Sequence, residues 1–268
     1  MTISTVRSIS FFAVAVGIAV TVQSSSAVEE VWRSDVRIDT PTELRGKKLF
    51  IQPGVKITFA GNGSLHLLDG SLRCERVKFE SDSVVTNDFR IHVRNGRIEF
   101  RDCFFRNVRA VNPAGKHFIQ GGICVSKGSK SRIKHCTFVN CSPVMAMNAH
   151  GMEVERNLTV GGDMGFSLLQ CRDVRLAGNE FHGISGIGLK LSNVLSSELS
   201  MNRFTACATG VRLYVCKDVR LVGNAVFGGR EGIVCQNYGE GIVENGNRFE
   251  AVRTPVRKSG SKPKEKKK

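Results

Sequence analysis

The chain has 268 residues, a net charge of +15, 28 glycines, nine cysteines and one tryptophan. A hydrophobic content of 41% and a charged content of 24% are values of a folded globular protein, so they exclude a wholly disordered chain and a multi-pass membrane protein. Glycine makes up about a tenth of the residues, above the usual ~7%, so turns must be frequent.

The N-terminus has the pattern of a signal peptide. Arg7 lies in a short basic region, the apolar run FFAVAVGIAV follows at 11–20, and small residues at 25–27 offer a cleavage site. An uncleaved anchor helix is the alternative, but polar residues interrupt the apolar run before it reaches the ~20 residues that a membrane span needs. We therefore expect residues 1–27 to be removed from a secreted or periplasmic protein that begins near Val28 and keeps no transmembrane anchor.

The C-terminal segment KSGSKPKEKKK, residues 258–268, contains six Lys, one Glu and no apolar residue, which is typical of a disordered basic tail. The two ends together carry seven basic residues and one acidic residue, so without them the net charge falls from +15 to +9. A positive charge of this size favours an anionic partner, although it does not specify a fold or a reaction.

Two short templates recur along the chain. One reads small-Gly-apolar-x-apolar, as at 164–168, 185–189 and 209–213. The other carries an Asn or Cys anchor, in most copies with Phe two places later, at intervals of 21–23 residues after a first interval of 33: Cys103, Cys136, Asn157, Asn179, Asn202, Asn224 and Asn247. The apolar residues alternate with the period of two that strands require, and no copy has helical spacing over ten positions, which excludes leucine-rich, ankyrin and tetratricopeptide arrays. A unit of about 22 residues with three short strands predicts one coil of a parallel β-solenoid.

These repeats resemble those of the pectin-lyase-like superfamily. The pattern is clearest in GFSLLQCRDVRLAGNEF (165–181) and GVRLYVCKDVRLVGNAVF (210–227), and residues 49–81 are similar to the opening coils of such proteins. The resemblance implies an all-β fold, a single-stranded right-handed parallel β-helix, which we expect to span residues 28–257. The superfamily includes polysaccharide lyases, glycosidases, epimerases and phage adhesins, so the fold alone does not decide the function.

Equivalent residues of successive coils stack about 4.8 Å apart in a parallel solenoid, so each template column is a stripe along the molecule. The anchor column predicts an inward ladder of hydrogen-bonded amides, which leaves Asn157 unavailable for glycosylation. The outward residues of the second strand alternate in sign at every coil and predict a self-neutralising charge ladder, which is a poor binding face: Glu99, Arg132, Glu153, Arg175, Glu198 and Arg220.

The outward residues of the first strand supply the candidate binding site. In our alignment their two columns are Met145, Ser167, Gly188, Arg212, Val234 and Met147, Leu169, Lys190, Tyr214, Gln236. Lys190, Arg212, Tyr214 and Gln236 thus fall on adjacent coils of one face. Binding of an acidic polysaccharide requires cations for carboxylate or sulfate groups, an aromatic ring for the sugar face and an amide for hydroxyls. An ordinary solvated strand face is the alternative.

Catalytic motifs do not assemble in this alignment. A lyase of the superfamily needs a Lys or Arg base beside carboxylates that hold calcium or neutralise a uronate, and no two of the nine Asp residues fall in adjacent coils of one column. Fragments similar to the polygalacturonase motifs occur in the wrong order: Gly162-Asp163, His182-Gly183 and Arg132-Ile133-Lys134.

Nine cysteines in an exported chain usually indicate disulfides, but the columns do not pair them. Cys171 and Cys216 share a column with Ser192 between them, which places them about 9.6 Å apart, beyond the ~7 Å that a disulfide spans. Only Cys103 and Cys136 stack on neighbouring coils. We therefore expect mostly free, buried thiols.

The leading hypothesis is an exported non-catalytic β-helix protein that binds an anionic polysaccharide or a cell-envelope component. The alternative is a polysaccharide lyase or uronate epimerase whose site the alignment misses, and a carboxylate cluster beside a Lys or Arg on one face would favour it. We expect a monomer with no nucleic-acid partner, no cofactor and no metal, because His135, Cys136 and Cys141 are too few for a zinc site.

Overall fold

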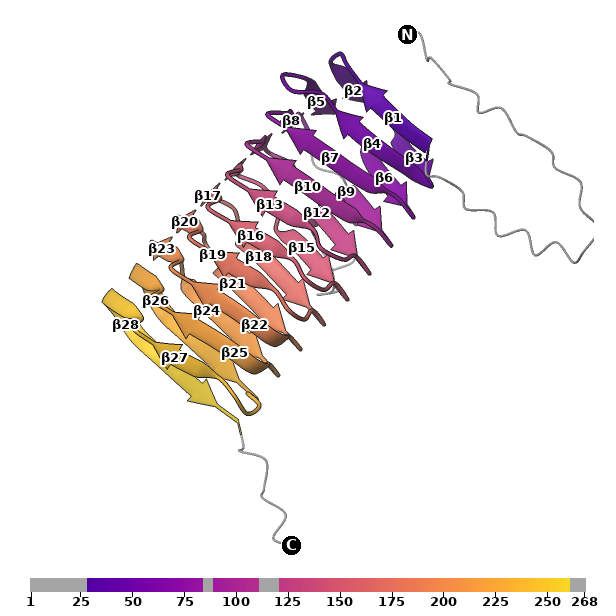
Figure 1. Ribbon diagram of the computed structural model, residues 1–268. Coiled ribbons are helices and arrows are strands. Elements are labelled where there is room, and N and C mark those ends of the chain that lie inside the picture. The colour runs from indigo at the N-terminus through magenta and orange to yellow at the C-terminus, as the bar shows by residue number, and fades with distance from the viewer. Residues whose placement is uncertain (1–27, 84–88, 111–120, 261–268) are drawn as a thin grey trace, which may run out of the picture.

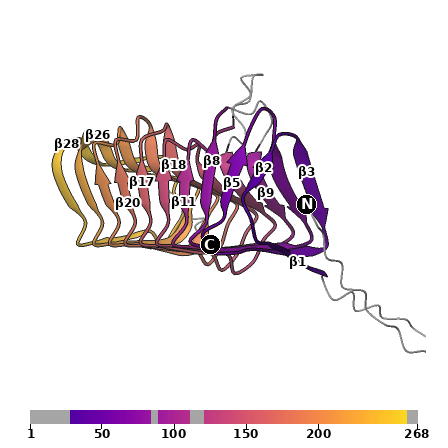
Figure 2. The ribbon, with the colours of Figure 1, turned by 90° about the horizontal axis from the view of Figure 1, so that it is seen from above.

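The computed structural model describes residues 28–83, 89–110 and 121–260, and all regular structure in these residues is β-strand. The chain winds into coils that stack along one axis, with β1 and β28 at opposite ends (Figure 1, Figure 2). The strands pair in parallel with the same strand of the next coil. The fold is therefore the right-handed parallel β-helix that the repeats predicted. The described residues contain no helix that could span a membrane.

Each coil contributes one strand to each of three faces. The first face is a sheet of ten strands: β1 (Val28–Trp32), β4 (Lys47–Ile51), β7 (Ser71–Glu75), β10 (Arg97–Arg101), β13 (Arg132–Lys134), β16 (Glu153–Glu155), β19 (Arg175–Ala177), β22 (Leu195–Ser200), β25 (Lys217–Val222) and β27 (Val243–Asn245).

The second face follows after a turn in each coil. It contains β2 (Val36–Ile38), β5 (Lys56–Phe59), β8 (Lys78–Ser81), β11 (Phe104–Arg106), β14 (Thr137–Val139), β17 (Leu158–Val160), β20 (Glu180–His182), β23 (Arg203–Thr205) and the first halves of β26 (Ala225–Gln236) and β28 (Arg248–Ser259).

The third face holds the candidate site. It contains β3 (Pro41–Arg45), β6 (Ser64–Leu68), β9 (Phe89–Arg94), β12 (Gly121–Ser126), β15 (Val144–Met147), β18 (Met164–Leu169), β21 (Ile187–Ser192), β24 (Thr209–Tyr214) and the second halves of β26 and β28.

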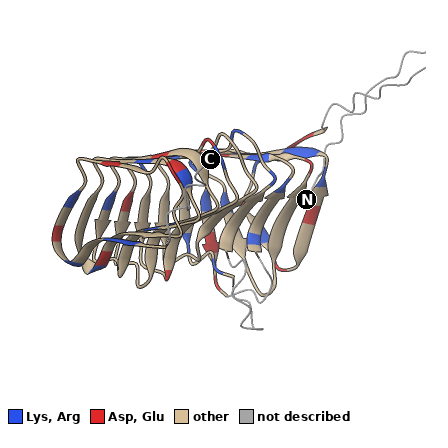
Figure 3. Ribbon diagram, turned by 90° about the horizontal axis from the view of Figure 1, so that it is seen from below, with Lys and Arg blue, Asp and Glu red and all other residues tan. Residues whose placement is uncertain are grey.

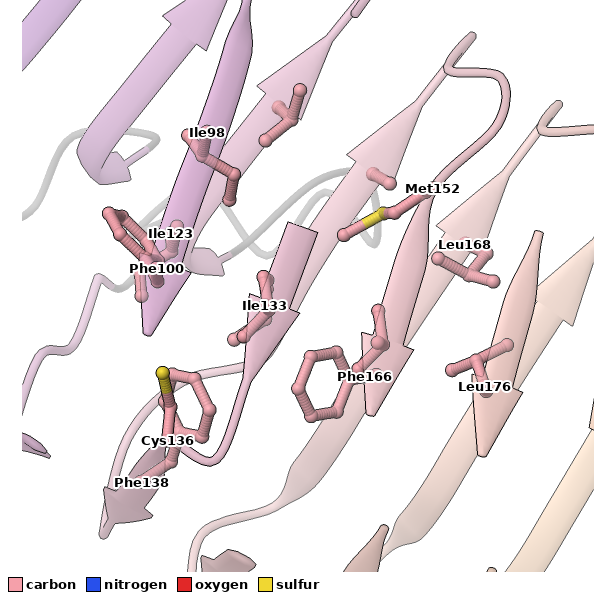
Figure 4. Close-up of a cluster of buried hydrophobic side chains, with 14 of the residues drawn as sticks. Ile98, Phe100, Ile123, Ile133, Cys136, Phe138, Met152, Phe166, Leu168 and Leu176 are labelled. Carbon is pink, nitrogen blue, oxygen red and sulfur yellow. The ribbon is translucent and has the colours of Figure 1, made fainter. Parts of the chain in front are cut away.

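Alternate residues of most strands point inward and form one continuous apolar core, part of which Figure 4 shows. Phenylalanine rings of the second face stack through it, with centroids 4.8 Å apart for Phe105–Phe138 and 4.9 Å apart for Phe181–Phe204. Thr159 takes the place of a ring between these two stacks, and Phe166 of the third face contacts both Phe138 and Phe181 instead, at 5.6 and 5.9 Å. Two faces of the coil thus supply the same aromatic column.

The asparagine anchors form the predicted ladder beside this core. The side-chain amides of Asn157, Asn179, Asn202 and Asn224 each donate to Oδ1 of the next Asn at 2.9–3.0 Å and to a backbone carbonyl of the preceding coil at 2.9 Å. The Oδ1 of Asn157 accepts from the backbone amide of Cys136, so the ladder begins at a cysteine. Asn157, Asn179, Asn202 and Asn224 are buried, which satisfies polar groups that would otherwise destabilise the core.

All nine cysteines are free and buried, as the columns indicated. A hydrogen bond with Cys136 lowers the pKa of Cys103, whereas burial raises the pKa of Cys136. Val194, not Ser192, lies between Cys171 and Cys216, because our alignment of this coil was wrong by two residues.

The ends of the chain require one correction. The predicted signal peptide, residues 1–27, lies outside the described residues. The tail was predicted to begin at Lys258, but β28 continues to Ser259, and the Lys258 ammonium lies 2.8 Å from the Glu244 carboxylate. The last apolar residue of β28 is Val256, so composition alone placed the start of the tail too early. Residues 261–268 lie outside the described part of the chain.

Candidate binding face

Two outward rows run along the third face. The first row consists of Glu43, His66, His92, Cys124, Met145, Ser167, Lys190, Arg212, Val234 and Arg257, in parallel register from coil to coil. The second row lies two residues further along each strand and includes Ser126, Met147, Leu169, Ser192, Tyr214 and Gln236. The first row thus changes from histidine and sulfur side chains to cationic ones along the solenoid.

The four residues predicted as a glycan site lie together on this face. Lys190 pairs in register with Arg212, and Tyr214 pairs with Gln236. Our alignment had placed Lys190 beside Tyr214 and Gly188 beside Arg212, and both placements were wrong by two residues. The corrected register puts the two cations directly side by side.

The glycines explain the error in register. The segment SGIGL contains Gly186 and Gly188, and the alignment used Gly186. In the structure Gly188 occupies the template position, because a Cβ there would lie 2.6 Å from a ring carbon of Phe204. Gly165 and Gly232 approach Phe181 and Phe249 in the same way. The template glycine therefore makes room for the aromatic column, a reason that composition alone does not reveal.

Glu231 is a member of this cluster that the sequence analysis missed. Its carboxylate lies 3.3 Å from the Arg212 guanidinium and 2.8 Å from that of Arg257, and Thr209 donates a hydrogen bond to it at 3.1 Å. One carboxylate thus partly neutralises two arginines, while Lys190 forms no ion pair within the described residues. The Nε of Arg212 is buried without a hydrogen-bond partner in the described part of the chain.

The other half of the first row carries soft donor atoms. Cys124 is fully buried and Met145 is 5% exposed, and with Phe89 they form a small cluster separate from the main core. The ring of His92 packs on Phe89 at 4.9 Å, and its Nε2 lies 2.8 Å from the hydroxyl of Ser126. The sequence analysis began this row at Met145 and missed His66, His92 and Cys124, because the intervals between them are irregular.

The first face carries the predicted alternating charges in the predicted register, and Arg73 extends the alternation by one coil. Lys and Arg accordingly lie interspersed with Asp and Glu along the solenoid (Figure 3). Lys134 lies between two carboxylates, 2.7 Å from Glu153 and 3.1 Å from Glu155. The hydrogen bond with Glu153 raises the pKa of Lys134, and the same bond lowers the pKa of Glu153. Both groups are therefore held in their charged forms.

No three His, Cys, Asp or Glu side chains gather as metal ligands in the described residues.

The profile of the family described as "Periplasmic copper-binding protein (NosD)" matches residues 67–261, well over half of the chain. The protein belongs to the NosD family. The periplasmic description of NosD agrees with the export expected from the sequence. No curated protein sequence matches this NosD-family chain.

Solved structures similar to this NosD-family protein share its fold at low identity. The periplasmic alginate epimerase AlgG is 11% identical, with a TM-score of 0.56 over 82% of this chain and 76% of AlgG. A glycoside hydrolase is 13% identical, with a TM-score of 0.55 over 70% of this chain and 38% of the hydrolase. These likenesses show the parallel β-helix fold and carry no function to this protein.

Proposed function

We propose that this NosD-family protein is an exported, non-catalytic binding protein, and that its third face binds an anionic polysaccharide or another anionic cell-envelope component. The observation that supports the proposal is the direct pairing of Lys190 with Arg212 beside the Tyr214–Gln236 pair. Three first-row cations on this face are balanced by Glu231 alone, so the cluster keeps a net positive charge.

The cluster matches the chemistry of an acidic sugar. The ammonium of Lys190 suits a carboxylate or sulfate, and so does the guanidinium of Arg212, whose side chain is 31% exposed. Tyr214 is 43% exposed, so its ring offers a surface on which a sugar can stack. Strand spacing of about 4.8 Å brings all these groups within the length of a disaccharide.

A lyase or epimerase remains the alternative that a carboxylate cluster beside a cation would favour. Such a cluster does occur on the first face, at Lys134, Glu153 and Glu155. A catalytic lysine base requires a lowered pKa, and a catalytic acid requires a raised one. Here the pKa of Lys134 is raised and that of Glu153 is lowered, so the ion pairs favour a structural role for this cluster.

Salt-dependent retention on immobilised alginate, pectate and heparin tests the proposal. The protein should be shortened by residues 261–268, because five tail lysines would bind polyanions without specificity. We expect the double variant Lys190→Ala/Arg212→Ala to elute at lower salt than the unaltered body. The double variant Arg132→Ala/Arg220→Ala removes the same charge from the first face and should elute with the unaltered body.

Two results would contradict the proposal. If both double variants lose retention equally, binding follows net charge and the third face is not a site. If the shortened protein is not retained on any column, binding belongs to the tail. Absorbance of unsaturated products in the same incubations would instead support a lyase.

A further inference from the structure

The apolar core is incompletely covered at both ends of the solenoid. Several apolar side chains pack against the core but are only partly buried, and they lie in the first or the last coil: Trp32, Val36, Leu44, Tyr238, Ile242, Phe249 and Val252. Solenoid proteins usually close their ends with a polar cap. The partly apolar ends of this solenoid therefore offer surface that a further coil could cover.

The end coils also leave strand edges unpaired among the described strands. β1, β2 and β3 pair only with the coil that follows, and β28 pairs only with the coil that precedes it. Such edges present backbone donors and acceptors to another strand. Every coil pairs with the next in the same parallel sense, so the free edge of the last coil is the complement of the free edge of the first.

The columns of the solenoid show which residues would meet if a second copy continued the stack. The first row of the third face begins at Glu43 and ends at Arg257. An outward column of the second face begins at Arg37 and ends at Glu250. Each column thus has opposite charges at its two ends, and stacking would bring these charges together at the strand spacing of about 4.8 Å.

Two further columns fit the same arrangement. Asp35 directly precedes β2 and accepts a hydrogen bond from the backbone amide of Lys56, which places it at the start of the column that ends at Arg248. The column of the first-face charge ladder begins at Val31 and ends at Val243, which is 50% exposed. Stacking would therefore add a third pair of opposite charges and one apolar pair.

The last coil also carries an inward ion pair. Glu244 and Lys258 lie in register with the core residues Leu221 and Cys235, and their charged groups are 2.8 Å apart. Because the two charges compensate each other, an adjoining coil would not meet an unpaired charge. Inward charges do discourage indiscriminate pairing of strand edges, so they favour a partner whose edge matches in register. We therefore expect a reversible contact.

We propose that copies of the mature protein, beginning near Val28, stack head to tail, with the last coil of one copy against the first coil of the next. The two surfaces differ, so the contact is heterologous. They lie at opposite ends of one axis, so copies add in a line and do not close into a ring (Figure 1, Figure 2). The inference departs from the monomer expected from the sequence, and it does not depend on polysaccharide binding at Lys190 and Arg212.

Disulfide trapping between copies tests the arrangement. Val31 and Val243 lie at opposite ends of the solenoid, so cysteines placed there can meet only between copies. A separation of about 4.8 Å between their Cα atoms is within the range that a disulfide spans. Under mild oxidation, we expect Val31→Cys/Val243→Cys to give a ladder of covalent oligomers on a non-reducing gel. An equimolar mixture of the two single variants should give a dimer only, and each single variant alone should give neither, because the native cysteines are buried.

Charge reversal measures the electrostatic part of the contact. Arg37→Glu and Glu250→Arg should each weaken self-association by about tenfold in sedimentation velocity at low salt, because each places like charges in register. The double variant Arg37→Glu/Glu250→Arg restores opposite charges and should associate like the unaltered protein. Glu180→Arg makes the same change at an exposed position in the middle of the second face and should have no effect.

Three results would overturn the inference. The first is that the unaltered mature protein sediments as a monomer at every concentration. The second is that either single cysteine variant alone forms as much covalent dimer as the mixture, since the contact would then join two identical ends. The third is that the double charge variant associates no better than the two single charge variants.

Discussion

The side-chain amide of Asn179 donates a hydrogen bond to Oδ1 of Asn202, one coil further on, at 2.9 Å. The same oxygen accepts the backbone amide of Asn179 at 3.0 Å, and the amide of Asn202 donates in turn to Leu176 O and Asn224 Oδ1. One side chain therefore satisfies the polar groups of three coils.

Replacing Asn202 with Ala should destabilise the protein strongly. The change leaves several buried donors and acceptors without partners, each at a cost of ~1–3 kcal/mol, so we expect a loss on the order of 3 kcal/mol or more. Asn247→Ala, at the half-buried end of the ladder, should cost less. Urea unfolding, monitored by circular dichroism, measures the free energy of unfolding of both variants. Equal losses would show that burial does not determine how much each Asn of the ladder stabilises the protein.

Reversal of one charge in the first-face ladder should have a modest, salt-sensitive effect. Arg175 lies in register between Glu153 and Glu198 and 3.7 Å from Glu155. Arg175→Glu replaces attractions with repulsions between exposed groups, so we expect a loss of roughly 1–2 kcal/mol that high salt reduces. Arg220→Glu, which faces a carboxylate on one side only, should lose less. A loss that salt leaves unchanged would contradict the electrostatic explanation.

The Lys134–Glu153 pair predicts the pH dependence of stability. The pKa of Glu153 lies below its ordinary 4.5 in the folded protein, so the carboxylate stabilises the fold above 4.5, and this contribution is lost as the pH falls through the lowered value. The pKa of Lys134 lies above its ordinary 10.5, so its contribution is present below 10.5 and is lost as the pH rises through the raised value.

Unfolding midpoints of the unaltered protein and of Glu153→Gln should therefore differ between these limits and converge below pH 4.5. Glu240→Gln serves as the control, since Glu240 forms no ion pair within the described residues, and it should match the unaltered protein throughout. A difference that persists unchanged at acidic pH would argue against the ion pair as its cause.

The thiols should be unreactive in the native protein and free after unfolding. All nine are buried and inaccessible to a reagent, and burial also raises the pKa of Cys141 to about 12 and that of Cys235 to about 11. We expect a thiol reagent to react slowly with the native protein, and to find at least seven thiols in the denatured, unreduced protein. Fewer than five free thiols would mean that disulfides form, which would contradict the structure, in which all nine cysteines are free.

The sequence predicted the parts of the structure that recur regularly from coil to coil. The Asn anchors and the alternating charges are in the predicted register because one residue type marks each column. The predicted register was wrong at Lys190, because both Gly186 and Gly188 fit the sequence template. The close approach of the Phe204 ring shows that Gly188 is the template glycine.

The binding groups were harder to predict because they do not repeat. Glu231 reaches Arg212 across coils although it lies in register with Thr209, so a column alignment does not bring them together. Cys124 was left out of the outward column, which began at Met145, since the interval before Cys124 is longer than the others. Side-chain length and coil insertions therefore determine which residues meet on this face, and neither repeats regularly along the sequence.

The asparagine ladder and the charge ladder have different periods. The asparagines repeat at every coil, whereas the charges repeat at every second coil. Deletion of one coil, residues 180–202, would preserve the sequence of asparagine anchors but place Arg175 beside Arg220. Deletion of two coils would keep both patterns. Within the stretch that carries the alternating charges, an even number of coils can therefore be removed without bringing like charges together, whereas an odd number cannot.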